Sequence, residues 1–321
     1  MATDTWLVPK EAGAPASLII GTMNFGKRTP AAEAERIVAR ALERGQRYFD
    51  TANVYNAGDS ERILGRALTG RRASAQIATK VGIGKLGANE GLAPERIRAA
   101  LDESLERLGT DYVDLYYLHA PDPKTPLEQT AEAMDLAVKS GKARAWGVSN
   151  FASWQITELF QICKTGNFVK PAISQVLYNL LIRQLDLEYF AFAKRYGIHT
   201  TIYNPLGGGL LAGKGLDGKF EPGSRFDGNK MYQRRYLSDR FFELARAYGQ
   251  LARDAGLEPV QLAYAWAAQR PGVDSVLLGP ATEAQLDAGI DGVALPLSKE
   301  VIEKADELHR AYLGTDVSYA R

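Results

Sequence analysis

"RYFDTANVYNAGDSERILGRAL", residues 47–68, contains the pattern from which the fold can be derived. Its first six residues predict a short buried strand, and residues 59–68 predict an amphipathic helix with Asp59 or Ser60 as its N-terminal cap. An acid, Asp50, stands where the strand ends, and Tyr55 follows in the loop. The stretch is therefore a strand–loop–helix unit with polar side chains after its strand.

The same kind of unit recurs along the chain. Short apolar runs predict strands at 17–22, 47–52, 76–82, 113–120, 143–150, 172–179, 199–205 and 274–279. Helical spacing predicts helices at 31–45, 59–68, 94–108, 126–140, 153–163, 186–196, 238–255, 259–269, from 282 to at least 288, and 298–312. Eight such units predict an α/β fold, a (β/α)₈ TIM barrel with extra C-terminal helices and a long loop after the seventh strand. We expect residues 1–321 to form a single domain, because no linker or change in composition divides the chain.

Composition excludes several classes of protein. The 321 residues are 45% hydrophobic and 24% charged, which is typical of a globular protein, and the net charge of +1 favours neither nucleic acid nor an anionic membrane as a partner. No apolar run approaches the roughly 20 residues of a membrane span, and the N-terminus lacks the pattern of a signal peptide. The single cysteine, Cys163, excludes an internal disulfide framework and an all-cysteine metal site. We expect a cytoplasmic protein without a bound metal.

Polar residues also end two other predicted strands. Lys80 ends the strand in "IATKVG", and His119 ends the strand in "YYLHA". Because chemistry in such barrels collects at the carboxyl ends of the strands, Asp50, Tyr55, Lys80 and His119 are expected at one rim. A lone lysine there could be a solvated strand end, and a lone histidine could be structural. The four together favour a catalytic site.

The chemistry of this set can be stated. A free phenol has a pKa of about 10, and a nearby ammonium lowers it, so we expect Lys80 to lower the pKa of Tyr55. Asp50 would hold Lys80, and His119 would donate a hydrogen bond to the oxygen that Tyr55 protonates. This suits protonation of a carbonyl oxygen while a cofactor hydride adds to its carbon. An alternative is that Lys80 forms a Schiff base, as in aldolase-type barrels.

Four motifs in this order, "FDTANVY", "IATKVG", "LYYLHAPD" and "WGVSNF", closely resemble the aldo-keto reductases from about residue 17 to the C-terminus. The resemblance implies an NADPH-dependent oxidoreductase that reduces aldehydes, and some ketones and dicarbonyls, to alcohols. It implies that Asp50, Tyr55, Lys80 and His119 are a catalytic tetrad with Tyr55 as proton donor. Potassium-channel β subunits share this fold and tetrad, so a cofactor-binding regulatory subunit is the alternative.

The cofactor site is expected outside any Rossmann domain, because no G-x-G-x-x-G turn joins a strand to a helix. The segment "YNPLGGGLLAGK", residues 203–214, could be a flexible lid, but its glycines also suit close approach of a pyrophosphate. The resemblance implies that this segment covers NADP(H), that Tyr203 stacks on the nicotinamide, and that Ser149, Asn150 and Gln175 hold the carboxamide. The other implied cofactor contacts are Gly21, Thr22, Asp50, Asn204, Pro205, Leu206, Gly207, Gly209, Leu210, Gly213, Lys214, Arg225, Gly279, Thr282 and Gln285.

Two features bear on selectivity. Residues 278–289 contain no basic residue for a 2′-phosphate, so Arg225 and Lys214 are expected to supply that charge. "GTMNFGKR", "YNLLIRQLDLEYF" and "SRFDGN" resemble the aflatoxin aldehyde and succinic semialdehyde reductase branch, which implies a homodimer and aldehydes that carry a carboxylate. The implied substrate contacts are Met23, Tyr55, His119, Tyr232, Arg235 and Arg321. Without that resemblance, "QRRY" would read as a solvated basic patch and Arg321 as a frayed terminus.

Overall fold

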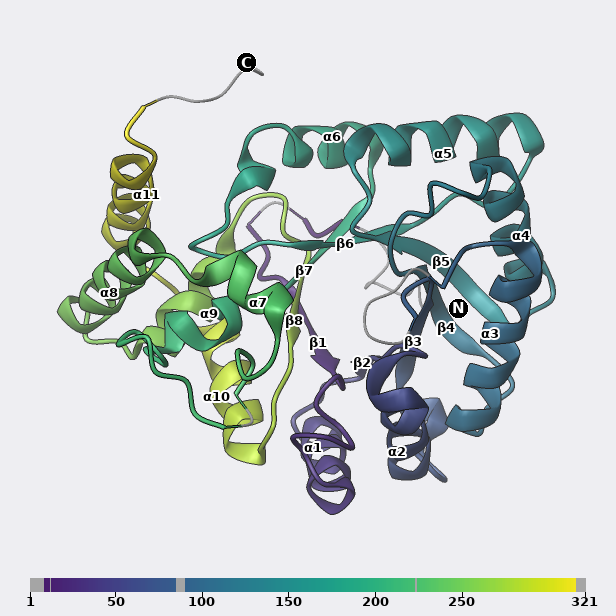
Figure 1. Ribbon diagram of the computed structural model, residues 1–321, viewed down its shortest axis with the longest axis horizontal. Coiled ribbons are helices and arrows are strands. Elements are labelled where there is room, and N and C mark those ends of the chain that lie inside the picture. The colour runs from purple at the N-terminus through teal and green to yellow at the C-terminus, as the bar shows by residue number, and fades with distance from the viewer. Residues whose placement is uncertain (1–8, 12, 85–89, 223, 316–321) are drawn as a thin grey trace.

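A closed barrel of eight parallel strands forms the centre of the protein (Figure 1). The computed structural model describes residues 9–11, 13–84, 90–222 and 224–315. The strands are β1 Ser17–Gly21, β2 Tyr48–Asp50, β3 Gln76–Val81, β4 Val113–Leu118, β5 Ala143–Ser149, β6 Ile173–Leu177, β7 His199–Tyr203 and β8 Ser275–Leu278. Each strand pairs with the next in chain order, and β1 pairs with β8. The predicted (β/α)₈ TIM barrel is confirmed.

Helices surround the barrel on its outside (Figure 1). They are α1 Ala31–Glu43, α2 Asp59–Ala67, α3 Pro94–Leu108, α4 Leu127–Lys139, α5 Ser153–Gly166, α6 Tyr189–Tyr196, α7 Lys230–Tyr236, α8 Asp239–Asp254, α9 Pro259–Gln269, α10 Glu283–Ala294 and α11 Lys299–Leu313. The first six follow β1 to β6 in turn, whereas α7, α8 and α9 lie between β7 and β8. The extra C-terminal helices are therefore confirmed, and α8 and α11 lie side by side at the left of Figure 1.

The connection after β7 is more ordered than expected. It contains a 3₁₀ helix, Gly207–Ala212, and then α7, neither of which the sequence predicted. Asn229 caps α7 by accepting a hydrogen bond from the backbone N–H of Tyr232. The sequence "KMYQRRY" has too little apolar spacing to indicate a helix, so local capping and packing decide its structure. The helix expected at 186–196 also begins later, because Gln184–Asp186 forms a separate 3₁₀ turn.

The interior of the barrel is filled by side chains below the rim. Ile19, Ala78, Leu115, Tyr117 and Ile173 form a cluster that is separate from the larger core between strands and helices. Because side chains alternate along a strand, Lys80, two positions beyond Ala78 on β3, also faces the interior. The barrel therefore has an apolar plug under any polar group at its carboxyl end.

The first turn of α2 differs from the prediction. Neither Asp59 nor Ser60 caps the helix with its side chain; its N-cap is Gly58, which has a left-handed backbone. The Ser60 hydroxyl instead donates to the backbone oxygen of Thr22 at 2.8 Å and lies 3.0 Å from the Thr51 hydroxyl. Ser60 is fully buried, so hydrogen bonding to the ends of β1 and β2 takes precedence over capping.

None of the helices in the described ranges is long and apolar enough to cross a membrane. Within the same residues, no three histidine, cysteine, aspartate or glutamate side chains are placed so that they could hold a metal ion. Cys163 is buried and unpaired with any other cysteine.

A close approach of α2 to α3 gives a test of this packing. A Cβ atom on Gly65 would lie 2.5 Å from the backbone oxygen of Leu108, which cannot move as a flexible side chain would. Gly65→Ala should therefore lower the free energy of unfolding by about 1–3 kcal/mol in chemical denaturation.

Gly249→Ala is the matched control, because Gly249 also lies in a helix but a Cβ there meets only Arg253 Nη1, at 3.6 Å. We expect this variant to be as stable as the wild type or slightly more so. Equal losses in both variants would show that the contact with Leu108 does not limit the α2–α3 distance.

Candidate active site

Four polar residues that the sequence singled out meet at the carboxyl end of the barrel. Asp50 is the last residue of β2, Lys80 lies near the end of β3, and His119 directly follows β4. All three are buried, with exposed fractions of 1%, 0% and 8%. Tyr55 begins the 3₁₀ turn Tyr55–Gly58 between β2 and α2. The expected juxtaposition is therefore present.

A buried ion pair joins Asp50 to Lys80. The Lys80 ammonium donates to Asp50 Oδ1 and, at 2.7 Å, to the backbone oxygen of Thr51. Gln175, from β6, donates to the other carboxylate oxygen at 2.9 Å. Burial lowers the pKa of Lys80, and the Asp50 carboxylate opposes that change. The amine is thus fully enclosed and already bonded, an arrangement that does not suit a Schiff-base nucleophile.

Tyr55 and His119 lie beside this ion pair. The Lys80 nitrogen is 5.2 Å from the centroid of the Tyr55 ring, and the His119 ring meets the Tyr55 ring edge-on with 5.8 Å between centroids. Burial raises the pKa of the Tyr55 phenol, and the Asp50 carboxylate adds to the rise. The lowered pKa expected for Tyr55 is therefore not found, because burial of the phenol is the largest effect on it. The phenol keeps its proton.

The His119 imidazole is held in a neutral form. Burial lowers its pKa well below the usual value, and the Lys80 charge lowers it further. Its backbone N–H donates to Val81 O at 2.7 Å, and its backbone oxygen accepts from Asn150 Nδ2 at 2.9 Å. These bonds fix the residue between β3 and β5. In the described part of the chain, its Nδ1 atom is buried without a hydrogen-bond partner.

A ring of amides and hydroxyls continues from β5 to β7. Asn150 Nδ2 also lies 3.0 Å from Ser149 Oγ, and the Tyr203 hydroxyl donates to Asn150 Oδ1 at 2.7 Å. Asn150 has a left-handed backbone, φ 62°, which turns its side chain at the end of β5. Gln175, expected to hold a ligand amide, donates to Asp50 through its Nε2 atom. The donors and acceptors at this edge are of the kind that a carboxamide would need.

The glycine-rich segment after β7 offers mainly backbone. Gly207, Gly208 and Gly209 all have positive φ values, of 56°, 72° and 113°. Their left-handed turn begins the 3₁₀ helix, and the absence of side chains allows a ligand to approach the backbone closely. Asn204 stabilises the turn by accepting from Gly208 N at 2.9 Å. The Lys214 backbone N–H donates to Gly209 O at 3.1 Å, which holds Lys214 next to these glycines.

Several predicted cofactor contacts have side chains that are already engaged. The Thr22 hydroxyl is within hydrogen-bond distance of Asp50 O and Ser60 Oγ, and Leu210 is fully buried in the core. Only the backbone of these two residues can face a ligand. Gly21, Pro205, Gly207 and Leu206 are buried or half-buried, as is expected of a lining made of backbone.

Cations without an acidic partner gather at the rim. Arg225 Nη1 lies 3.2 Å from Met23 Sδ, and the guanidiniums of Arg225 and Arg235 lie 5.8 and 5.9 Å from the centroid of the Tyr232 ring. In the described ranges, neither arginine forms an ion pair with a carboxylate. Burial raises the pKa of Tyr203 to about 12, and the nearby Arg235 charge opposes the rise. Unpaired guanidiniums at a rim suit anionic ligands.

Sequence reasoning missed a third arginine at this place. Burial lowers the pKa of Arg28, and the charge of Arg225 lowers it further. Arg28 belongs to a turn in which Asn24 donates to Gly279 O at 3.0 Å, which joins the loop after β1 to the loop after β8. Nothing in a single sequence indicates which loops of a barrel meet at the rim.

The loop after β8 is arranged as a helix cap. Thr282 Oγ1 accepts from the backbone N–H of Gln285 at 3.2 Å, and Gln285 Oε1 accepts from Ala281 N at 2.9 Å. Gly279 lies beside Arg225, since a Cβ on it would be 3.6 Å from Nη2. The final predicted site residue, Arg321, lies outside the described residues.

Comparisons with known proteins agree with this geometry. The sequence model of the aldo/keto reductase family matches residues 17–310. Human aflatoxin B1 aldehyde reductase member 2 is 36% identical over 292 residues, which cover 85% of this chain and 80% of that protein. Human aldo-keto reductase family 7 member A3 is 35% identical over 292 residues, covering 85% and 87%. A probable voltage-gated potassium channel subunit beta from Oryza sativa subsp. japonica is 33% identical over 293 residues, covering 88% and 89%.

The neutral imidazole predicts a pH profile. Since the pKa of His119 lies well below its usual value, the ring stays neutral above that pKa and gains a proton only in more acidic solution. Turnover by the wild type should therefore show no inflection from this histidine between about pH 6 and pH 8. Steady-state rates across that range provide the test. An inflection near the usual histidine pKa that disappears in His119→Gln would contradict it.

Proposed function

The chain belongs to the aldo-keto reductase family, and on that premise we propose that it is an NADPH-dependent oxidoreductase. It reduces aldehydes, and some ketones and dicarbonyls, to alcohols, and its substrates include aldehydes that carry a carboxylate. The observation that carries the proposal is the cluster of Tyr55 and His119 around the buried Lys80–Asp50 pair. A protonated phenol and a neutral imidazole side by side can both donate a hydrogen bond to one carbonyl oxygen.

Tyr55 is the proton donor in this proposal. Burial keeps its phenol protonated until a carbonyl oxygen gains negative charge beside it. His119, neutral and fixed by its backbone, donates to the same oxygen and orients the carbonyl group. When the phenol releases its proton, the Lys80 ammonium at 5.2 Å from the ring stabilises the phenolate. NADPH, when bound, supplies the hydride that the carbonyl carbon receives.

The cofactor assignment is supported by two parts of the rim. Ser149, Asn150 and Gln175 lie at the ends of β5 and β6, where their hydroxyl and amide groups would hold the carboxamide, and the Tyr203 ring at the end of β7 would stack on the nicotinamide. The left-handed glycines at 207–209 carry no side chain that would obstruct a pyrophosphate, and the following Lys214 can supply a cation. Arg225 is the candidate for the 2′-phosphate, because it lies beside Gly279 and lacks an acidic partner among the described residues.

Preference for carboxylate-bearing aldehydes is proposed from Arg235 and Tyr232, with Met23 at the wall of the pocket and Arg321 as a further arm. Arg235 lies against the Tyr232 ring and close enough to Tyr203 to oppose the rise of its pKa. An unpaired guanidinium there can hold a carboxylate through a charge-assisted hydrogen bond. The human relative named aflatoxin B1 aldehyde reductase member 2 supports an aldehyde as substrate.

We also propose that residues 1–321 act as one catalytic domain in the cytoplasm and that the protein forms a homodimer. The single buried cysteine supports a reducing compartment. A regulatory subunit is the second candidate function, because the rice protein named a probable potassium channel subunit beta is similar over 88% of this chain. NADPH oxidation with 4-nitrobenzaldehyde and 2-carboxybenzaldehyde distinguishes the two, since catalytic turnover is expected only of the enzyme.

Tyr55→Phe tests the proton donor. This change removes one hydroxyl and should lower the turnover number by about 10²–10⁴-fold, which is the usual contribution of general acid catalysis. Cofactor binding, followed by quenching of tryptophan fluorescence, should be nearly unchanged because the ring remains. Retention of more than a third of the wild-type single-turnover rate would rule out this role for Tyr55.

Arg235→Ala tests recognition of the substrate carboxylate. Loss of a charge-assisted hydrogen bond costs about 1.5–3 kcal/mol, so KM for succinic semialdehyde or 2-carboxybenzaldehyde should rise roughly 10- to 150-fold. KM for an uncharged aldehyde should hardly change.

Arg234→Ala is the matched control, because this neighbour on α7 is exposed to solvent. It should leave both classes of aldehyde unaffected. If Arg235→Ala raises KM equally for charged and uncharged aldehydes, the guanidinium shapes the pocket and does not bind the carboxylate.

A further inference from the structure

The backbone directly after Tyr55 adopts a conformation that needs external support. Asn56, Ala57 and Gly58 have φ values of 50°, 55° and 89°, so three consecutive residues are left-handed. Alanine has no side-chain group that stabilises this region, and non-glycine residues enter it rarely. Such conformations persist where surrounding contacts determine them, and they cluster at functional sites. The contacts of this turn therefore decide where the Tyr55 phenol lies.

Three of the contacts that hold the turn come from its base and from its two sides. At its base, the hydroxyls of Thr51 and Ser60 are 3.0 Å apart and close the loop. On the side of the rim, Asn56 Nδ2 donates to the backbone oxygens of Met23 and Phe25. On the opposite side, Gly58 packs against the side chain of Arg107. A Cβ on Gly58 would lie 2.6 Å from the Cδ atom of that arginine, so no other residue fits there without displacing it.

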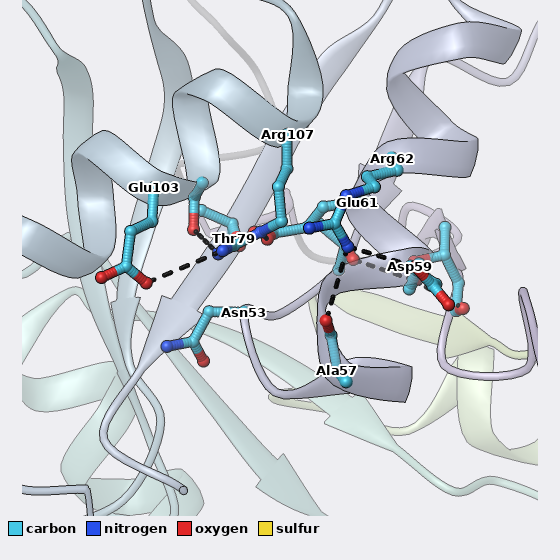
Figure 2. A network of polar contacts seen from close by, with 12 residues as sticks. Asn53, Ala57, Asp59, Glu61, Arg62, Thr79, Glu103 and Arg107 are labelled. Carbon is cyan, nitrogen blue, oxygen red and sulfur yellow. Dashed lines mark hydrogen bonds and ion pairs between the residues drawn. The ribbon is translucent and has the colours of Figure 1, made fainter. Parts of the chain in front are cut away.

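Arg107 is fixed by a buried carboxylate. Figure 2 shows it extending from α3 toward Glu61 and Thr79. Its Nε atom donates to Glu61 Oε2 at 2.5 Å, and the exposed fractions of the two side chains are 15% and 0%. Glu61 Oε1 accepts from the Thr79 hydroxyl at 2.5 Å. A carboxylate with both oxygens bonded and no exposure has one geometry, and it imposes that geometry on Arg107.

The Glu61–Arg107 pair connects the two parts of the candidate site, which are Lys80 on β3 and the turn that begins with Tyr55. Thr79 immediately precedes Lys80 on β3, and Gly58 ends the turn that begins with Tyr55. Glu61 thus links the strand of the ammonium to the turn of the phenol, through Arg107, without touching the space where a substrate or cofactor would bind. Glu61 and Arg107 are 46 residues apart in the sequence.

We propose that Arg107 and Glu61 are positioning residues for Tyr55. The proposal rests on the reductase function above. In it, the ion pair forms the support against which Gly58 closes the left-handed turn, and this support keeps the phenol at a fixed distance from Lys80 and His119. Loss of the support moves the phenol and slows proton donation, while the binding of cofactor and aldehyde is preserved.

The decisive comparison uses two half-buried arginines on the same barrel. Arg107→Ala removes the support of the turn, and Arg72→Ala is the matched control. Arg72 donates to Asp114 Oδ2 at 2.8 Å, and the same oxygen accepts from Ile77 N at the amino end of β3, away from the rim. Both variants lose a half-buried arginine–carboxylate pair, with side-chain exposure of 15% and 0% in one and 21% and 8% in the other.

Single-turnover hydride transfer from NADPH to 4-nitrobenzaldehyde is the first readout. Arg107→Ala should slow transfer about 10- to 100-fold, the usual effect of a small displacement of a reacting group, with KM and cofactor affinity within about twofold. Arg107→Lys should recover most of the rate, because it keeps the Cδ atom that packs on Gly58 and a cation for Glu61. Arg72→Ala should lower the melting temperature but leave transfer within about twofold.

Transfer by Arg107→Ala within about twofold of the wild type, or an equal loss in Arg72→Ala, overturns the proposal. So does a loss that lies in KM or in cofactor affinity. If Arg107→Ala does not fold, Glu61→Gln replaces it, since glutamine keeps the shape but removes the charge and one of the two oxygens that accept from Arg107 and Thr79. It should slow transfer in the same direction, and an unchanged rate overturns the proposal.

A second readout separates this inference from the proposed function. In protein labelled with ¹³Cζ-tyrosine, the Tyr55 resonance is assigned by Tyr55→Phe. Arg107→Ala should shift or broaden this resonance, whereas Arg72→Ala should leave it unchanged. If the wild type transfers no hydride, the proposed function fails, and the resonance alone decides whether Arg107 positions Tyr55. An unaltered resonance in Arg107→Ala contradicts the inference whatever the activity.

Discussion

The buried ion pair between Asp50 and Lys80 is the interaction on which the rest of the structure depends. Both side chains are enclosed, and a buried charge that loses its partner costs about 3–5 kcal/mol. Parallel pairing of β2 with β3 brings the two groups together, and Gln175, which the closed barrel brings from β6, donates to the carboxylate. The register of three strands is therefore tied to one electrostatic contact. Tyr55 and His119 are arranged around its cationic end, which is why this end of the barrel, and not the other, can support chemistry on a carbonyl group.

Charged side chains near the site fall into two groups with different roles. One group is paired and buried, as in Asp50–Lys80 and Glu61–Arg107, and it sets positions. The other lies at the rim without acidic partners in the described chain, as in Arg225 and Arg235, and it is available to anionic ligands. This separation follows from the cost of desolvation. A charge behind the strands must be paired within the protein, whereas a charge at the rim remains hydrated until a phosphate or a carboxylate binds.

Much of the fold could be predicted from sequence, because parallel strands buried on both faces read as short apolar runs and each is followed by a helical period. Asp50 at the end of β2 and Lys80 near the end of β3 could be predicted as site residues because each is a polar residue in an apolar run. What could not be predicted depends on contacts between distant segments. The raised pKa of Tyr55 arises from burial. The place of Arg28 depends on the contact of Asn24 with Gly279, which joins the loops after β1 and β8, and the role of Ser60 depends on a hydrogen bond to Thr22 that replaces capping.

The most direct test of the central claim is single-turnover hydride transfer in Lys80→Met. Methionine fills similar space and removes the ammonium that holds Asp50 and stabilises the phenolate. With a folded protein that still quenches its tryptophans on binding NADPH, the account predicts that transfer to an aldehyde falls by about 10²–10⁴-fold. Transfer at a rate close to that of the wild type would contradict it, because the buried ion pair would then be a structural feature of the barrel with no part in the reaction.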